Sequence, residues 1–353
     1  MNKLKFKRIA WFSDTLEQNN GVAQYIDNIA PYLSKRMQLT VYTGRVTKPH
    51  NFNTVSLPYI KSPTTPDYDI ILPTARKECD LVHAHSPYML GLHAAKYEVP
   101  KIVTAHFLPQ HTLEWFFGQK QPELFVGAGW DFEVWFLNLF DAVICQTHVG
   151  AGMFKGKGVR KPIHVIANGM KLEEFKKGNA KRFEEKFHVK DFALFVGRVD
   201  ASKRPEWIIQ AAKKLPHRRF VIAGSGIMLD SLEKPPNVHF IGRISRSDIV
   251  DAYHAANFVM MPSRAETEGL VAQEAMASGK PLVVSDDPVL DEVVGKAGVR
   301  CRNVNEFVDA VEELFENKKK YNELKEQALV EVSKRRIEDS VEALEKLYLK
   351  MLD

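Results

Sequence analysis

The sequence predicts an α/β protein of two domains, each with a parallel sheet doubly wound by helices. Three observations support this: a length of 353 residues, short apolar runs that alternate with longer helical patterns, and a second series of the same alternation. Hydrophobic residues make up 45% and charged residues 26% of the chain, which excludes fibrous and disordered classes.

The first series has a strand at each of six short apolar runs: 8–12, 39–42, 81–83, 101–104, 142–145 and 164–166. Apolar positions after Gly21 follow helical spacing, so the chain begins with a strand, a glycine loop and a helix that Pro31 makes irregular. The second series has strands at 192–196, 219–223, 238–241, 258–261 and 281–284. We therefore expect an amino-terminal Rossmann-like domain at 1–166, a second at 167–335, and a ligand cleft between them.

The last fifty residues consist mainly of helix formers. Asn305 is the expected N-cap of a helix with apolar residues at Phe307, Val311 and Leu314. A final helix at 336–353 carries one apolar stripe, which must pack on another surface.

Composition also limits the compartment and the partners. Cys79, Cys145 and Cys301 are odd in number and far apart, which favours a reducing compartment and argues against a disulfide framework or a zinc site. The start of the chain lacks a secretory pattern, so a cytoplasmic protein is expected. The net charge of +5 is too small to indicate a nucleic-acid partner. Residues 1–165 hold that surplus, with 18 Lys and Arg against 13 Asp and Glu.

Two glycine patterns do not fit nucleotide fingerprints. Residues 15–21 contain one glycine and the Gly224–Gly226 segment two, whereas a dinucleotide fingerprint needs three. The sequence therefore disfavours a Rossmann oxidoreductase. The spacing of 150–158 is wrong for a phosphate loop, and we interpret this segment as a basic surface loop.

The strongest local pattern is at 261–281. A strand is followed by a loop with Glu266, a helix that starts near Gly269, a glycine stop at Gly279 and the next strand. Free amides at the helix start can bind an anion, and Glu274, just over one turn along, suits the vicinal hydroxyls of a ribose. Spacing alone leaves two solvated glutamates as an equal alternative.

A second pattern at 195–205 places Gly197 at the end of a strand, with Arg198 and Lys203 in the loop before a helix. Such cations can neutralise a diphosphate leaving group. Taken alone, a loop of this kind is more often merely solvated.

Together, these motifs resemble the retaining glycosyltransferases of family 4, which have the two-domain GT-B fold. The matching segments are Asn20-Gly21, Asp80-Leu-Val-His83-Ala-His85-Ser-Pro87, Thr104-Ala-His106, Val165-Ile-Ala-Asn168-Gly169 with Phe175, Gly197-Arg198 with Lys203, and the Glu-x7-Glu pair. The resemblance implies an acceptor-binding first domain, a donor-binding second domain, and a final helix that returns to the first domain.

The resemblance also implies residue roles. Arg198 and Lys203 would bind the donor diphosphate, Glu274 the ribose, and Glu266 the transferred sugar. The backbone of Thr267, Glu268, Gly269 and Leu270 would contact sugar and phosphate. His106 would lie near sugar and acceptor, unless it is a histidine satisfied by protein contacts. Gly21 would let the backbone approach the diphosphate, unless it is a plain turn glycine. No metal or other cofactor is implied.

Four positions depart from the family pattern. Thr267 and Glu268 replace the usual glycine and aromatic, which bears on the shape of the sugar pocket. Asn20 replaces a frequent second glycine and Lys171 a frequent acidic residue.

The implied reaction moves a hexose from a nucleoside diphosphate sugar, with a uridine or guanosine base, to a hydroxyl. The first half concentrates aromatic residues at 115–117, 124–126 and 130–140 and basic residues at 155–161, which suits an anionic membrane. Residues 12–22 and 85–87 further resemble the members that glycosylate diacylglycerol. We therefore expect a membrane lipid or lipid-linked glycan as acceptor and peripheral contact with the inner face of the membrane. The alternatives are a soluble acceptor, a sugar-nucleotide epimerase, and a binding module without turnover.

Overall fold

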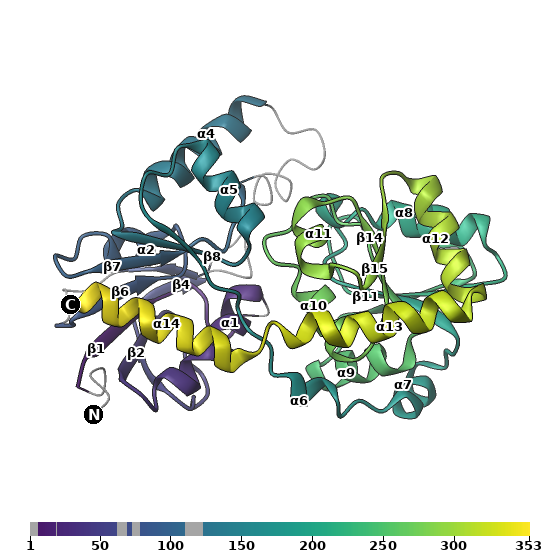
Figure 1. Cartoon of the computed structure of the whole chain (residues 1–353), viewed down its shortest axis with the longest axis horizontal. Helices are drawn as coiled ribbons and strands as arrows, with labels where there is room; N and C mark the ends of the chain where they lie inside the picture. Colours follow the sequence, from purple (N-terminus) through teal and green to yellow (C-terminus); the bar gives the residue numbers. More distant parts are fainter. Residues whose placement is uncertain (1–5, 19, 62–68, 73–77, 110–122) are drawn as a thin grey trace. The chain divides into compact units, whose positions relative to one another are not determined.

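The computed structural model describes residues 6–18, 20–61, 69–72, 78–109 and 123–353, and its described part divides into two compact units. Unit 1 comprises the described residues up to Gly169 together with Ile337–Asp353, and unit 2 comprises Met170–Arg336. The sequence placed these boundaries at 166/167 and 335/336. Figure 1 draws the elements of both units.

Unit 1 is built on a seven-stranded parallel sheet in the order β3-β2-β1-β6-β7-β8-β9. Its strands are β1 (Arg8–Phe12), β2 (Gln38–Thr43), β3 (Asn53–Ser56), β6 (Leu81–Ala84), β7 (Lys101–Thr104), β8 (Ala142–Cys145) and β9 (Ile163–Val165). An antiparallel pair, β4 (Tyr59–Lys61) and β5 (Asp69–Ile71), stands apart from this sheet. Its helices are α1 (Gly21–Leu33), α2 (Met89–Ala94), α4 (Glu123–Leu137), α5 (His148–Lys157) and α14 (Ile337–Leu352).

Unit 2 is built on a six-stranded parallel sheet in the order β12-β11-β10-β13-β14-β15. Its strands are β10 (Phe192–Val196), β11 (Arg219–Ala223), β12 (Val238–Gly242), β13 (Phe258–Met261), β14 (Leu282–Ser285) and β15 (Gly298–Cys301). Its helices are α6 (Leu172–Phe175), α7 (Ala180–Phe187), the 3₁₀ turn η1 (Ala201–Lys203), α8 (Pro205–Lys214), α9 (Arg246–Ala255), α10 (Leu270–Ala277), α11 (Pro288–Val294), α12 (Val304–Glu316) and α13 (Lys318–Ser333).

The strand order reverses at one place in each sheet. In unit 1 the switch lies between β1 and β6, and in unit 2 between β10 and β13. Open parallel α/β sheets bind ligands beyond the carboxyl ends of the strands at such switch points. The loops after these four strands are therefore where a site is expected.

The last helix, α14, belongs to unit 1, as the family resemblance implied. It packs on α1 and β6, and its buried residues Ile337, Val341, Leu344, Leu347 and Tyr348 join the core that includes Trp11 and Ile26. This assignment changes the charge asymmetry, because residues 337–353 hold five Asp and Glu against two Lys. The net charge of +5 carried by residues 1–165 is therefore reduced by three when the charges of this helix are added to it.

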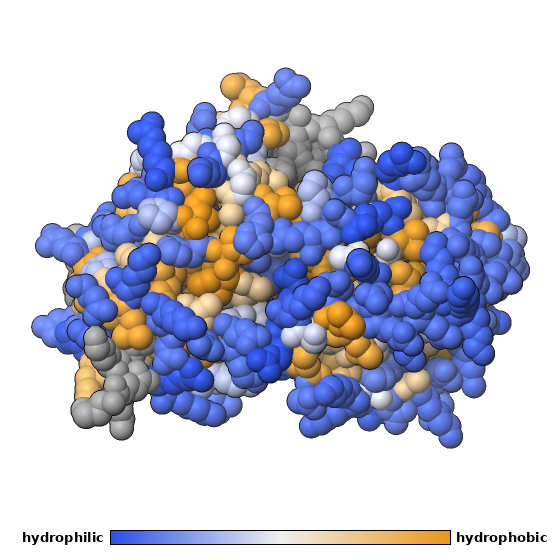
Figure 2. Space-filling model, in the orientation of Figure 1, coloured by the Kyte–Doolittle hydropathy of each residue, from blue (hydrophilic) through white to orange (hydrophobic). Residues whose placement is uncertain are grey.

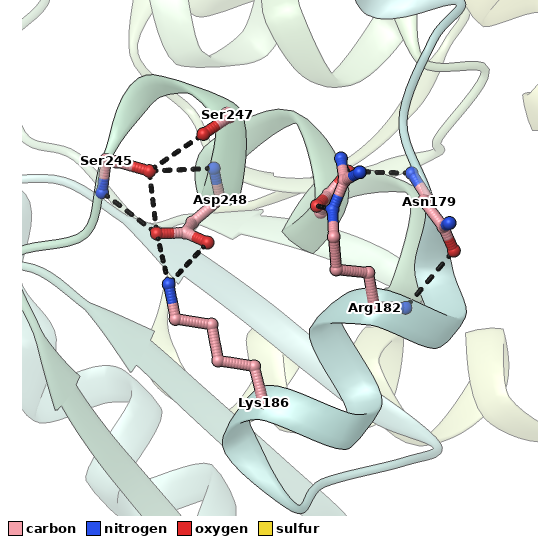
Figure 3. A network of polar contacts seen from close by, with 7 residues as sticks. Asn179, Arg182, Lys186, Ser245, Ser247 and Asp248 are labelled. Atoms are coloured by element: carbon pink, nitrogen blue, oxygen red, sulfur yellow. Dashed lines mark hydrogen bonds and ion pairs between the residues drawn. The ribbon is translucent and has the colours of Figure 1, made fainter.

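A polar network joins α7 to α9 in unit 2 (Figure 3). Arg182 pairs with the buried carboxylate of Asp251, and Lys186 reaches Asp248 at 2.8 Å. Ser245 and Asp248 form a capping box that starts α9. These contacts hold Asn179, Arg182 and Lys186 against α9.

Two local predictions were wrong. The 150–158 segment is not a loop, because His148–Lys157 form α5, capped by Thr147 and ended by Gly158 at φ 111°. The N-cap of α12 is Asn303 rather than Asn305, since the Asn303 side chain accepts from the amides of Asn305 and Glu306.

Candidate functional site

The loop after β10 carries the predicted cations of unit 2. Asp200 orders this loop, because its carboxylate accepts from the backbone and hydroxyl of Ser202 at 3.1 and 2.6 Å. The same carboxylate lies 3.1 Å from Nε of Arg198, whose side chain is 46% exposed. Arg198 is thus oriented by Asp200 and accessible to a ligand.

Lys203 and Glu266 meet across the switch point of unit 2. Lys203 is in η1 after β10, Glu266 is in the loop after β13, and Nζ lies 2.5 Å from Oε1. The amide of Arg264 donates to the carbonyl of Ser202 at 2.7 Å and joins the same two loops. A predicted diphosphate cation and a predicted sugar-binding carboxylate therefore lie side by side.

The loop after β13 leads into α10 through a left-handed residue. Gly269 is the N-cap of α10 with φ 64°, where a Cβ would lie 3.0 Å from a methyl of Leu290. The first amides of a helix lack acceptors within the helix, so they can bind an anion. Thr267 and Leu270 are half-buried here and Glu268 is buried. The helix therefore starts where the sequence predicted.

Glu274 is held by residues that the sequence analysis missed. Its Oε1 pairs with Arg246 of α9, and its Oε2 accepts from the hydroxyl of Tyr253 at 2.8 Å. Arg246 also donates to Glu174 at 2.7 Å and stacks over Phe175. These acidic partners raise the pKa of Arg246, and burial beside Glu274 raises that of Tyr253.

Burial and charge also affect Asp287, the N-cap of α11. Burial and the Glu266 carboxylate raise its pKa to about 6.

The glycines after β11 have a packing role, because a Cβ on Gly224 would lie 1.8 Å from the carbonyl oxygen of Gly197. Gly224 thus lets the ends of β10 and β11 approach, which a search for a fingerprint could not detect.

In unit 1, Gly21 is the first residue of α1. Asn20 is the N-cap, and its side chain accepts from the amide of Ala23 at 3.0 Å. The substitution of asparagine for a second glycine therefore supplies a cap.

His106 follows β7 and is half-buried among other rings. Its Nε2 lies 3.3 Å from Nδ1 of His85, and its Nδ1 lies 3.4 Å from the amide nitrogen of Gln146. Tyr25 of α1 meets the ring edge to face. Burial lowers the pKa of His106 to about 3 and those of His83 and His85 well below 6.5, so all three imidazoles are neutral at pH 7.

Unit 1 thus has neutral histidines in β6 (His83), after β6 (His85) and after β7 (His106). Unit 2 has an ion pair beside a helix start at its switch point. Two doubly wound parallel-sheet units of this kind are the architecture of the GT-B fold. Residues 19–174 match the family described as Glycosyltransferase Family 4, and residues 176–330 match Glycosyl transferases group 1. The chain is therefore built of these two glycosyltransferase domains.

Named relatives and solved structures agree with this class. D-inositol 3-phosphate glycosyltransferase of Mycolicibacterium smegmatis is 30% identical over 261 residues, which are 67% of this chain and 60% of the relative. The enzyme of that name from Mycobacterium leprae is 34% identical over 173 residues, 43% of this chain and 40% of the relative. This chain thus matches about half the length of these relatives.

The fold is shared with more distant proteins. Sucrose-phosphate synthase of Thermosynechococcus elongatus has a TM-score of 0.79 at 18% sequence identity. The match covers 98% of this chain and 99% of the synthase chain. HepE of Anabaena, solved with UDP-glucose, has a TM-score of 0.78 at 17% sequence identity. The match covers 97% of this chain and 99% of the HepE chain.

Proposed function

We propose that this chain is a retaining glycosyltransferase that moves a hexose from a nucleoside diphosphate sugar to a hydroxyl of a membrane lipid or lipid-linked glycan. The Lys203–Glu266 pair carries the transferase part of the proposal, because it joins a cation for the diphosphate to a carboxylate for the sugar. HepE and this chain share a fold, and HepE was solved with UDP-glucose, which supports a uridine donor.

In the proposed reaction the acceptor oxygen bonds to the anomeric carbon on the face from which the diphosphate leaves. The bond from that carbon to the β-phosphate oxygen breaks, its electron pair stays on the phosphate, and the phosphate takes the acceptor proton. Negative charge grows on the leaving phosphate, so Arg198, Lys203 and the first amides of α10 stabilise the transition state more than the ground state. These groups need no metal to do so.

The surface of α4 supports a lipid acceptor. Exposed apolar side chains follow one face of this helix, with Leu124 80%, Phe125 47%, Phe132 43% and Trp135 52% exposed. Figure 2 shows hydrophobic side chains at the surface where Figure 1 draws the start of α4. Other aromatics of the predicted cluster, Trp130, Phe136 and Phe140, are core residues, and residues 115–117 lie outside the described part.

Basic residues also lie near α4, on the side of Trp130 rather than on its exposed apolar face. Lys157 of α5 lies over the ring of Trp130, and the amide of Arg160 donates to Asn138 just beyond α4. Lys155, Lys157 and Arg160 are exposed. Apolar side chains beside lysines and arginines suit the headgroup region of an anionic bilayer. In the described part of the chain, no helix is long and apolar enough to span a membrane.

A second candidate acceptor is a soluble phosphorylated polyol. The observation that favours it is the name of the 30% identical relatives, which are inositol 3-phosphate glycosyltransferases.

Transfer assays with labelled uridine and guanosine diphosphate sugars would distinguish these acceptors. We expect label in lipid when anionic vesicles containing diacylglycerol are supplied, and little transfer to inositol 3-phosphate. Phe125→Ser with Trp135→Ser should lower both vesicle binding and lipid labelling. Leu329→Ser with Val330→Ser is the matched control, because both side chains are 50% exposed on α13 of unit 2.

Efficient labelling of the soluble polyol, with no flotation on vesicles, would contradict the lipid acceptor while keeping the transferase. An epimerase would instead convert the donor without any acceptor, and a binding module would release no nucleoside diphosphate.

A further inference from the structure

The hydroxyl of Tyr348 lies inside unit 1, at the junction of α14 with the sheet. It is 2.9 Å from Nε1 of Trp11 on β1 and 2.6 Å from Nδ1 of His83 on β6. All three side chains are fully buried. A polar group from the last helix therefore reaches the strands on both sides of the switch point.

The hydrogen positions in this network follow from its chemistry. An indole N–H can only donate, so the Tyr348 oxygen accepts from Trp11 and its own hydrogen goes to Nδ1 of His83. The buried imidazole of His83 is neutral, so its proton must be on Nε2, which lies 2.7 Å from Oγ1 of Thr104. Tyr348 thus selects one tautomer of His83.

His83 is connected to His106 by two routes. The first passes through His85, whose ring centroid lies 4.2 Å from that of His83 and whose Nδ1 lies 3.3 Å from Nε2 of His106. The second passes through Thr104, the last residue of β7, whose carbonyl accepts from the backbone amide of His106 at 3.1 Å. The place of the His106 ring therefore depends on groups that Tyr348 orders.

Within the described part of unit 1, one nitrogen of this cluster lacks a hydrogen-bond partner. Nε2 of His85 is buried and makes no hydrogen bond among the described residues. An unsatisfied buried nitrogen costs free energy, so the ring keeps this place only because its neighbours hold it there. Trp11 packs against His85 with ring centroids 4.4 Å apart, and Trp11 is itself fixed by Tyr348.

We propose that Tyr348 is a positioning residue for His106, so that the last helix orders the acceptor-side histidines of unit 1. This inference rests on the proposed function, in which His106 lies near sugar and acceptor. Tyr348 touches neither substrate and acts through His83, His85 and Thr104.

Tyr348→Phe tests the proposal, because it keeps the ring in the core and removes only the hydroxyl. Tyr32→Phe is the control, since Tyr32 is a partly buried tyrosine packed against the same core. We expect the acceptor KM of Tyr348→Phe to rise about tenfold, the effect of one lost hydrogen bond, with the donor KM within about twofold. The histidine side-chain nitrogen signals of His83 and His106 should shift in Tyr348→Phe and stay unchanged in Tyr32→Phe.

An unchanged acceptor KM or unchanged His106 signals in folded Tyr348→Phe would overturn the proposal and leave Tyr348 a packing residue. If that variant does not fold, Thr104→Val removes the far end of the network at nearly constant shape and should raise the acceptor KM in the same way. A wild-type protein without transfer activity would refute the proposed function instead. The His106 signals would then still decide whether Tyr348 positions that ring.

Discussion

The ammonium of Lys203 lies 2.5 Å from the carboxylate of Glu266, although 63 residues separate them in the chain. The pair joins the loop after β10 to the loop after β13, the two strands that flank the switch point of unit 2. A nucleotide-sugar site needs positive charge for the diphosphate and acceptors for the sugar hydroxyls. The switch point supplies both at one place.

The first prediction concerns the cation of this pair. Lys203→Ala should lower the rate of sugar transfer by about 10²–10³, the usual cost of one group that stabilises transition-state charge. Lys213→Ala is the control, because Lys213 forms an exposed pair with Glu233 on the same unit. Turnover with saturating donor is the measurement, and a folded Lys203→Ala with wild-type turnover would refute the assigned role.

The second prediction concerns the hydrogen bond from Tyr253 to Glu274. Tyr253→Phe should lower the free energy of unfolding by about 1.5–3 kcal/mol, because the buried carboxylate loses a hydrogen bond. Tyr321→Phe on α13 should change it by less than about 0.5 kcal/mol. Urea titration of both variants checks this, and equal stabilities would show that the Tyr253 hydroxyl contributes nothing.

A third prediction tests the start of α10. Gly269→Ala forces a side chain into a left-handed conformation beside Leu290, and it should destabilise the protein by about 1–2 kcal/mol. Donor affinity should weaken, because the first amides of α10 would shift. Gly156→Ala in α5 is the matched control: its Cβ meets open space, so helix propensity should stabilise the protein by up to about 1 kcal/mol. Calorimetry of the donor complex together with thermal unfolding would show a failure of either expectation.

A fourth prediction concerns pH and Glu133 of α4. Burial raises the pKa of this carboxyl to about 8, against an ordinary value of 4.5. The folded state therefore binds a proton that the unfolded state releases. The stability contributed by this group is fully present below about pH 4.5 and is lost as pH rises through 8.

Glu133→Gln removes this dependence. The stability of the variant relative to wild type should therefore rise by up to about 1.4 kcal/mol per pH unit between pH 5 and 8. Denaturant unfolding of both proteins at several pH values measures the difference, which cancels the titration of all other groups. A difference independent of pH would mean that Glu133 ionises normally in the folded protein.

Much of the fold was predictable because central parallel strands are buried on both faces and therefore apolar throughout. The strands that were not predicted lack this signal. Asn53–Ser56 of β3 are exposed or half-buried at the sheet edge, and Gly298–Cys301 of β15 include an exposed arginine. The misread α5 contains three glycines, at 150, 152 and 156, and Gly158 is its C-cap, so its sequence resembles a loop.

The candidate site was predictable where its residues follow strands directly, as Arg198, Lys203 and Glu266 do. Its supporting partners were not, because no local spacing connects Glu274 with Arg246, Tyr253 and Glu174. Likewise, the final apolar stripe predicted a helix that packs on another surface. It could not show that the Tyr348 hydroxyl would meet the indole of Trp11, 337 residues away in the chain.

The most direct test of the account is acceptor-dependent release of nucleoside diphosphate. The purified chain is incubated with uridine, guanosine or adenosine diphosphate sugars, with and without anionic vesicles that contain a lipid acceptor. We predict that one uridine or guanosine sugar is consumed, that nucleoside diphosphate and glycosylated lipid form in equal amounts, and that Lys203→Ala slows both by about 10²–10³. Conversion of the donor without acceptor, or binding without release of nucleoside diphosphate from any donor, would contradict it.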